Sequence, residues 1–253
     1  MDLELGGRRA VVIGATRGIG RAITQRLAEE GCELAICARN GDHVGATVRE
    51  LTAGGFAASG RAVDAGDHEA LRRFVDDAAV RMGGLEVFVM NASGAFGGGN
   101  DDASWRRGVE VDILGTVAGC EAALPHLTQS GSGAILVVGT VSAIEAVGPR
   151  RAYNSVKAAV IPYVKSIARE MAPAVRANVV SPGQIFFDGG VWDFVKQNRP
   201  EQFAEALDRN PMGRMGTPEE VADVVAFLAS PRAGFVSGTN VLCDGARTQN
   251  VQY

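Results

Sequence analysis

Short runs of apolar and β-branched residues alternate along the chain with longer segments whose apolar positions recur at helical spacing. Seven such runs predict strands, at residues 9–13, 33–37, 60–63, 85–90, 133–138, 177–180 and 240–242. Apolar residues at consecutive positions are typical of strands that are covered on both faces. Strands separated by helix-length segments favour parallel pairing. The pattern therefore predicts a single α/β domain over residues 1–253, with a doubly wound, seven-stranded parallel sheet flanked by helices on both faces.

Polar residues and prolines mark the ends of several predicted helices. Thr217 and Pro218 combine a side-chain cap with a residue that suits the first helical position, so a helix is expected to begin there. Another helix is expected over 151–171 and should end before Pro173. The segment 186–210 fits neither a strand nor a simple crossover.

The glycine content is about twice that of an ordinary globular protein, with 33 glycines among 253 residues. The chain has only 9 prolines and no Gly-x-y period, which argues against a collagen-like segment or a flexible linker. We therefore expect glycines where the backbone turns sharply or closely approaches another group.

Charge and composition exclude several classes of partner. The formal net charge is −4 and no long basic run occurs, so nucleic acid and acidic membrane surfaces are not expected partners. The 4 cysteines and 3 histidines show no metal-ligand spacing, and no metal site is expected. The first residues are acidic where a signal peptide is basic, and no apolar stretch approaches the length of a membrane span. We expect a cytoplasmic protein that acts on a small molecule.

The first predicted strand ends in a glycine-rich turn that is followed at once by an amphipathic helix. In Gly14-Ala15-Thr16-Arg17-Gly18-Ile19-Gly20, the first glycine allows the sharp turn, the second leaves room for a pyrophosphate, and the third lets the helix approach the strand. The amides and dipole of the helix N-terminus attract phosphate. The turn indicates a Rossmann dinucleotide site formed by Gly14, Thr16, Arg17, Gly18, Ile19 and Gly20, although a plain glycine-rich corner is the alternative.

The second strand ends without the acidic residue that usually binds the adenosine ribose of NAD. Arg39 stands there instead, and together with Arg17 it suits a 2′-phosphate, because guanidinium groups bind phosphate oxygens in pairs. The cofactor predicted is therefore NADP(H), unless both arginines are ordinary surface charges. Asp64, after the third strand, is a candidate for the adenine amino group or for a helix cap.

Tyr153 and Lys157 are four residues apart within a predicted helix, so they project from one face. A phenol ordinarily has a pKa near 10, and a close ammonium lowers it by favouring phenolate. The pair is a candidate general acid, although such pairs are more often plain surface neighbours.

Taken with these motifs, the chain resembles the short-chain dehydrogenase/reductase family over nearly its whole length, in particular 3-oxoacyl-[acyl-carrier-protein] reductases and other ketoreductases. The resemblance also covers Asn91-Ala92-Ser93-Gly94, Ser181-Pro182-Gly183 and the closing Asp244-Gly245. It implies that Tyr153 protonates a carbonyl oxygen as hydride arrives from NADPH, and that Lys157 holds the nicotinamide ribose. It implies further cofactor contacts from Asn91, Ala92, Ser93, Pro182, Gly183 and Ile185.

The family's carbonyl-holding serine falls at Thr140, thirteen residues before the tyrosine, and Ser142 is the nearby alternative. The family's catalytic asparagine falls at Asp112, which adds a negative charge to the proton relay. Asp112 is also reminiscent of 2,4-dienoyl-CoA reductases, but these lack the tyrosine that is present here. A non-catalytic NADP(H)-binding regulator is a third hypothesis for the function.

The resemblance places a substrate-binding lid at 186–210. Phe187 stands where the family often has a threonine that contacts the nicotinamide amide. The substrate contacts predicted are Thr140, Ser142, Phe96, Phe186, Phe187 and Trp192, which indicate an apolar substrate, such as a cyclic ketone, a polyketide or an acyl thioester. The family usually forms homotetramers through helices near 103–127 and 151–171 and the C-terminal segment, so a homo-oligomer, a tetramer or a dimer, is expected.

Overall fold

The computed structural model describes residues 1–94, 99–146 and 150–251 and contains one sheet of seven parallel strands. The sheet order is β3-β2-β1-β4-β5-β6-β7. The strands are β1 Arg9–Ile13, β2 Glu33–Ala38, β3 Ala58–Ala62, β4 Val87–Met90, β5 Gly133–Val138, β6 Val175–Pro182 and β7 Asn240–Cys243. All seven predicted strands are confirmed, and β6 extends beyond its predicted range at both ends.

Successive strands are added to one side of β1 as far as β3 and to its other side from β4 onward, so the strand order reverses between β1 and β4, which pair in parallel with Ile13 beside Met90. On the other side of β1, Ile13 lies beside Cys37 of β2. The carboxyl ends of the central strands therefore meet at one edge of the sheet, on either side of the switch point. In doubly wound sheets this is where ligands bind.

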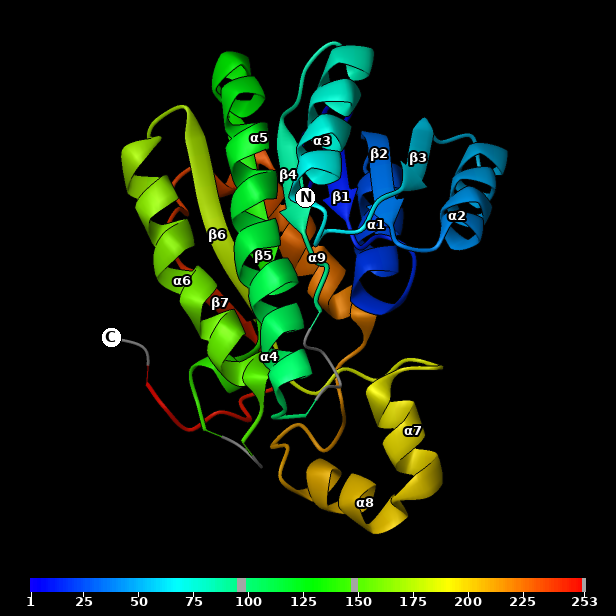
Figure 1. Cartoon of the computed structure of the whole chain (residues 1–253), viewed down its shortest axis with the longest axis vertical. Helices are drawn as coiled ribbons and strands as arrows, with labels where there is room; N and C mark the ends of the chain where they lie inside the picture. The colour runs from blue at the N-terminus through cyan, green and yellow to red at the C-terminus, as the bar shows by residue number, and fades with distance from the viewer. Residues whose placement is uncertain (95–98, 147–149, 252–253) are drawn as a thin grey trace.

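Two buried apolar clusters hold helices to opposite faces of the sheet. One face carries α3, α5 and α6, and the other carries α1, α2 and α9 (Figure 1). The helices are α1 Gly18–Glu29, α2 Gly41–Ala53, α3 His68–Met82, α4 Asp102–Gly108, α5 Thr116–Ser130, α6 Ala152–Glu170, α7 Val191–Asn198, α8 Pro200–Asp208 and α9 Pro218–Ala229. The predicted doubly wound fold is confirmed.

Local sequence signals account for the helix ends that were predicted. The Thr217 hydroxyl accepts a hydrogen bond from the Glu220 amide at 3.3 Å, and the Glu220 carboxylate accepts one from the Thr217 amide at 2.9 Å. This capping box starts α9 at Pro218. Helix α6 ends at Glu170, before Pro173, as expected.

The helix predicted over 103–127 is not continuous, and this prediction is corrected. Between α4 and α5 the residues Val109–Gly115 form a π-helical segment. Such turns are rare and cluster at functional sites. This one contains Asp112, whose main-chain oxygen accepts a hydrogen bond from the Thr116 hydroxyl at 2.7 Å.

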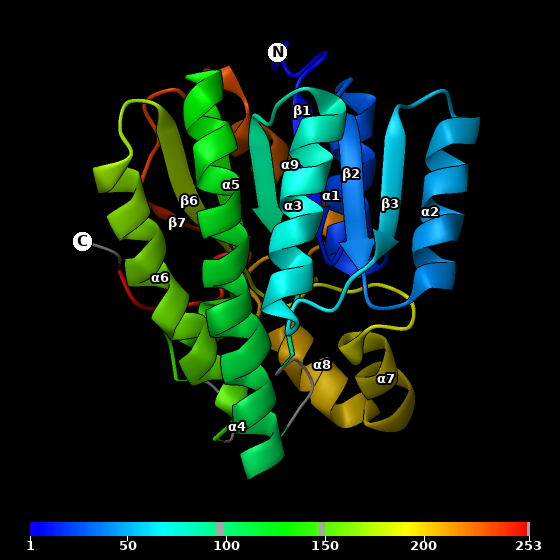
Figure 2. The same cartoon turned by 45° about the horizontal axis from the view of Figure 1, so that its top comes forward.

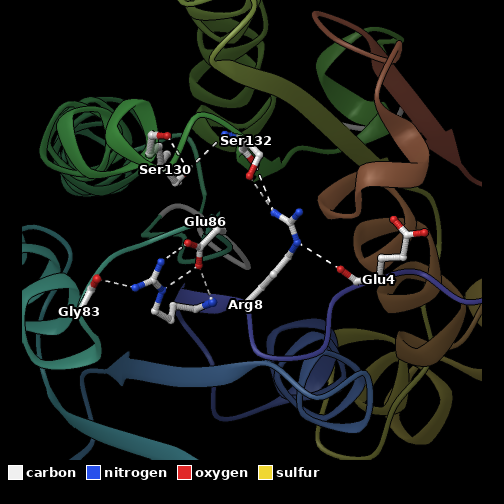
Figure 3. A network of polar contacts seen from close by, with 8 residues as sticks. Glu4, Arg8, Gly83, Glu86, Ser130 and Ser132 are labelled. Atoms are coloured by element: carbon white, nitrogen blue, oxygen red, sulfur yellow. Dashed lines mark hydrogen bonds and ion pairs between the residues drawn. The ribbon is translucent and has the colours of Figure 1, made fainter.

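Ion pairs and hydrogen bonds tie the amino ends of the strands together, at the sheet edge away from the switch point. Glu86, just before β4, receives hydrogen bonds from the amide and Nε of Arg9 at 2.8 and 2.9 Å (Figure 3). Arg8 donates to the hydroxyl of Ser132 at 3.1 Å and to the main-chain oxygen of Glu4 at 3.2 Å. These contacts join the starts of β1, β4 and β5.

Segment 186–210, which sequence patterns left unassigned, contains α7 and α8. Both helices lie together beyond the carboxyl ends of the strands, in the direction in which the arrowheads of β2, β3 and β4 point (Figure 2). The rings of Phe186 and Phe203 meet edge to face, 6.0 Å apart, and Lys196 lies 5.1 Å from the centre of the Phe186 ring. Lys196 of α7 also lies 5.9 Å from the centre of the Phe203 ring of α8, so aromatic and cation–π contacts connect the two short helices to each other and to Phe186.

Candidate active site

The glycine-rich turn after β1 has the geometry that its three glycines predict. Gly14 and Gly18 adopt left-handed φ angles of +81° and +51°. A Cβ on Gly14 would lie 2.8 Å from the amide nitrogen of Ala92, and one on Gly20 would lie 2.0 Å from the Gly14 oxygen. The side chain of Asn91 donates to that same oxygen at 2.8 Å. The turn is therefore braced by the loop after β4, and the side chain of Asn91 holds it through the main-chain oxygen of Gly14.

The N-terminus of α1 is suited to bind an anion. Arg17, at its N-cap, has no side-chain cap bond, and the first turn carries no acidic residue. The hydroxyl of Ser93 is buried without a hydrogen-bond partner among the residues that the structure describes. First-turn amides, a helix dipole and a spare hydroxyl fit the pyrophosphate and ribose of a dinucleotide.

Phe187 lies over this turn. A Cβ on Gly18 would lie 2.6 Å from its Cζ atom, and one on Gly190 would lie 3.0 Å from the same ring. The sequence assigned Phe187 to the substrate pocket, whereas the structure places its ring against the phosphate-binding turn. A pyrophosphate that approaches the backbone of Gly18 must therefore displace this ring.

Two of the residues predicted for the adenosine end, Arg39 and Asp64, lie close enough for their charges to interact. Arg17 and Arg39 are exposed, and the charge of Arg39 acts on Asp64. Asp64 pairs with Arg107 of α4, whose Nη2 lies 2.6 and 2.8 Å from the two carboxylate oxygens. Partial burial acts to raise the pKa of Asp64, but hydrogen bonds from the Gly66 amide and from Arg107 outweigh it, so this pKa is lowered.

The helix-cap alternative for Asp64 is wrong, because Asp67 caps α3 by accepting from the Ala70 amide at 3.0 Å. The sequence did not reveal Arg107. It lies 43 residues after Asp64, and no local spacing connects the two.

Tyr153 stands in the first turn of α6 and forms a side-chain hydrogen bond with Thr140, which follows β5. Thr140 is buried, and its oxygen also accepts a hydrogen bond from the Ser142 amide at 3.3 Å. Of the two candidate hydroxyls, that of Thr140 is hydrogen-bonded to the Tyr153 phenol. Ser142 contacts Thr140 through its main-chain amide.

Burial raises the pKa of Tyr153, the hydrogen bond with Thr140 opposes that rise, and the negative charge of Asp112 adds to it. The sequence predicted that Lys157 would lower this pKa, and that expectation is corrected. The Lys157 ammonium is paired with Asp112, with 3.2 Å between Nζ and Oδ1. An ammonium whose charge is matched by a neighbouring carboxylate does little to favour phenolate.

The segment after β6 forms one wall of the same edge. The amide of Gly183 donates to the main-chain oxygen of Cys243 at 2.9 Å, and a Cβ on Gly183 would lie 2.7 Å from the Asp244 Cβ. Pro182 ends β6, and Ile185 is buried and forms a bridge with Gly216. This wall leads directly into Phe186 and Phe187.

The remaining predicted aromatic contacts differ in how the structure places them. Phe186 is partly buried against Phe203, and Trp192 is partly buried in α7. Phe96 lies outside the described residues. Within the described ranges, no group of three or more His, Cys, Asp or Glu could hold a metal ion. No helix of those ranges is long and apolar enough to cross a membrane.

Comparisons with known proteins show which family the chain is similar to. The model of a family described as Enoyl-(Acyl carrier protein) reductase matches residues 14–247. The isoepoxydon dehydrogenase patN of Penicillium expansum is 33% identical over 254 residues, which cover 98% of each chain. The cis-4-hydroxycyclohexanecarboxylate dehydrogenase of Sinomonas cyclohexanicum is 35% identical over 248 residues, which cover 95% of this chain and 96% of that one.

Among solved structures, the L-sorbose reductase of Gluconobacter frateurii, in complex with NADPH and L-sorbose, matches with a TM-score of 0.91 at 27% identity. The match covers 99% of this chain and 100% of the reductase. Sequence and fold thus agree over nearly the whole length. The chain belongs to the short-chain dehydrogenase/reductase family of oxidoreductases.

Proposed function

We propose that this protein is an NADP(H)-dependent oxidoreductase that interconverts a ketone and its secondary alcohol, with Tyr153 as the proton donor. The observation that carries the proposal is the hydrogen bond between Tyr153 and Thr140 at the carboxyl edge of the sheet, with Lys157 one helical turn away. The turn of Gly14, Gly18 and Gly20 lies at the same edge, after β1. Proton donor and cofactor turn are therefore on the side of the sheet where this fold binds ligands.

The protein residues have separate tasks in this reaction. A bound nicotinamide supplies the hydride. Thr140 holds the carbonyl oxygen through its hydroxyl, and Tyr153 gives that oxygen a proton as charge develops on it. The first-turn amides of α1 hold the pyrophosphate, while Lys157, Asn91, Ala92 and Ser93 line the ribose and nicotinamide side.

The preference for NADP(H) over NAD(H) is supported by charge at the adenosine end. Arg39 follows β2, where NAD-binding proteins usually have a carboxylate that binds the ribose and would repel a 2′-phosphate. Both Arg39 and Arg17 are exposed. Their guanidinium groups are therefore accessible to a phosphate. The related reductase of Gluconobacter frateurii was solved with NADPH.

A ring ketone is the substrate class that the relatives support. Two of the matched proteins are named for activity on ring alcohols, a cis-4-hydroxycyclohexanecarboxylate dehydrogenase and a cyclohexanol dehydrogenase. We place the substrate under residues 186–210, which act as a lid within the single domain of residues 1–253, with Phe186 and Trp192 on its inner side. Closing such a lid excludes water during hydride transfer.

A homo-oligomer is the expected assembly. The described part of the α4–α5 region exposes large apolar side chains, with exposed fractions of 37% for Trp105, 38% for Val109 and 44% for Leu114. Apolar side chains gathered on one region favour contact with another protein surface. A second copy of this chain is the partner that we propose.

The test follows NADPH absorbance with cyclic ketones, acyclic ketones and enoyl thioesters. Cyclic ketones should be reduced fastest, and Tyr153→Phe should lower kcat by roughly 100-fold or more, the usual contribution of a general acid. Tyr163→Phe is the matched control, because Tyr163 lies on the same helix but its hydroxyl donates to Glu121 at 2.9 Å. Full activity in Tyr153→Phe would refute the mechanism.

The same panel separates the alternatives. Turnover of enoyl thioesters alone would indicate enoyl reduction. Tight NADPH binding without turnover of any compound would indicate a regulator that uses the fold as a sensor.

A further inference from the structure

A carboxylate and an ammonium are buried together next to the predicted proton donor. Asp112 Oδ1 and Lys157 Nζ are 3.2 Å apart, and their side chains are 0% and 4% exposed. Aspartate and lysine are almost never buried so completely unless they are paired. The pair joins the π-helical segment to α6, the helix that carries Tyr153.

Three further hydrogen bonds fix the geometry of this pair. The second carboxylate oxygen of Asp112 accepts from the Gly94 amide at 2.9 Å, and the Asp112 main-chain oxygen accepts from the Thr116 hydroxyl at 2.7 Å. Lys157 also donates to the main-chain oxygen of Val138 at 3.0 Å. Because the loop after β4, helix α5 and strand β5 all hold the pair, neither charge can move far without breaking a bond.

The charged groups next to Tyr153 come from two elements. Lys157 lies one turn along its own helix, and Asp112 comes from the π-helical segment; Thr140, after β5, offers an uncharged hydroxyl. Arg107 of α4, a helix that also packs against α6, is engaged with Asp64. Arg106 is exposed, as is Arg151 at the start of α6. Within the described residues, the charge that acts on Tyr153 is therefore that of Asp112, opposed by the ammonium with which it is paired.

We propose that Asp112 is a positioning residue that neutralises the Lys157 ammonium, keeps Tyr153 protonated, and so favours ketone reduction over alcohol oxidation near neutral pH. The inference rests on the proposed function. A lone ammonium beside a phenol stabilises the phenolate, whereas a close ion pair has little net charge and stabilises it much less. An asparagine at this position would keep the contact with the Gly94 amide but would leave the ammonium unmatched.

The direction of the reaction follows from the proton balance. In reduction the Tyr153 O–H bond breaks, its electron pair stays on the phenolate oxygen, and a new O–H bond forms on the former carbonyl oxygen. Oxidation needs the reverse, in which the phenolate takes a proton from the alcohol as hydride leaves for the oxidised nicotinamide. A phenol that stays protonated is ready for the first reaction and unavailable as a base for the second.

The test compares pH profiles of kcat for both directions in the parent and in Asp112→Asn. The variant should shift the apparent pKa downward by roughly one to two pH units, the usual effect of an unmatched neighbouring charge. Oxidation at neutral pH should rise about tenfold for each unit, because the phenolate fraction rises by that factor. Glu110→Gln is the matched control, since this carboxylate lies in the same segment but is 47% exposed and faces His68, so it should leave both profiles unchanged.

A second measurement does not depend on activity. The ultraviolet absorbance of phenolate is titrated with pH, and the titration of Tyr153→Phe is subtracted to isolate Tyr153. The phenolate signal should appear at lower pH in Asp112→Asn, and Asp112→Ser removes the same charge if the asparagine variant does not fold. An unchanged titration and unchanged pH profiles would overturn the inference while leaving the proposed reductase intact. Full activity in Tyr153→Phe would instead overturn the proposed function.

Discussion

Removing the ring of Phe187 should tighten the binding of NADPH. The ring lies against Gly18 so closely that a Cβ on that glycine would be 2.6 Å from its Cζ atom. A pyrophosphate needs access to the same stretch of backbone, because the absence of a side chain at the second glycine of the turn is what admits it. We therefore expect the ring and the cofactor to compete for one surface, so that cofactor binding includes the displacement of the ring.

The structure sets the size of this effect. Phe187 is partly buried and packs against the apolar cluster that holds α1 to the sheet. Full burial of a phenylalanine side chain contributes about 1.5–3 kcal/mol, so a partly buried ring contributes about 1 kcal/mol that cofactor binding must overcome. Since 1.4 kcal/mol corresponds to a factor of ten in Kd, Phe187→Ala should bind NADPH about fivefold more tightly.

The assay is a titration of NADPH by fluorescence or calorimetry, which needs no substrate. Phe194→Ala is the matched control, because Phe194 lies in α7 of the same segment and is 56% exposed, and its Kd should equal that of the parent. Phe187→Thr separates two effects, since it removes the ring and also restores the hydroxyl common in the family. If Phe187→Ala binds NADPH no better than the parent, the ring does not compete and the reasoning fails.

Three further predictions concern other parts of the molecule. Thr217→Ala removes the capping box of α9 and should lower the free energy of unfolding by about 1 kcal/mol, measured by urea denaturation. Although partial burial acts to raise the pKa of Glu86, its hydrogen bonds with Arg9 lower that pKa below the ordinary 4.5, so its contribution to stability is present above pH 4.5 and lost as pH falls through the lowered value. Glu86→Gln should therefore be less stable than the parent at neutral pH but lose less stability on acidification, as followed by thermal melts from pH 7 downward. Arg39→Asp should weaken NADPH by roughly ten- to a hundredfold and NADH far less, and an equal loss for both in Kd titrations would contradict the 2′-phosphate contact.

The fold was predictable because its strongest signals are local. Most of the strands contain a short apolar run, and α9 begins at a capping box that Thr217 and Glu220 form around Pro218. The break at Val109–Gly115 was not predictable, since nothing in its apolar spacing distinguishes a π-helical turn from an α-helical one. Helices α7 and α8 were also missed, because each is too short for helical periodicity to stand out.

The candidate site also contains features that local sequence signals predict and features that they do not. Motif spacing placed Gly14 in a turn after a strand and Tyr153 and Lys157 on one helix, as the structure has them, because a turn and a helix face follow from sequence neighbours. The pairing of Asp64 with Arg107 could not be predicted, because it depends on a tertiary contact between α4 and the residues that follow β3. Two charged residues from distant segments have no characteristic spacing in the sequence. Sequence analysis could therefore identify Asp64 as a candidate but not its partner Arg107.

Two of the departures from the family pattern, Asp112 and Phe187, have opposite physical consequences for the same site. At position 112 a carboxylate replaces an amide of nearly the same shape, so the packing can stay as it is while the local charge changes. At position 187 an aromatic ring replaces a small hydroxyl side chain, so the charge stays the same while access to Gly18 changes. Asp112→Asn should therefore alter pH profiles without changing the Kd for NADPH more than a few-fold, and Phe187→Ala should alter that Kd without moving the pH profile. A double variant whose two effects simply combine would show that protonation and cofactor entry are set independently.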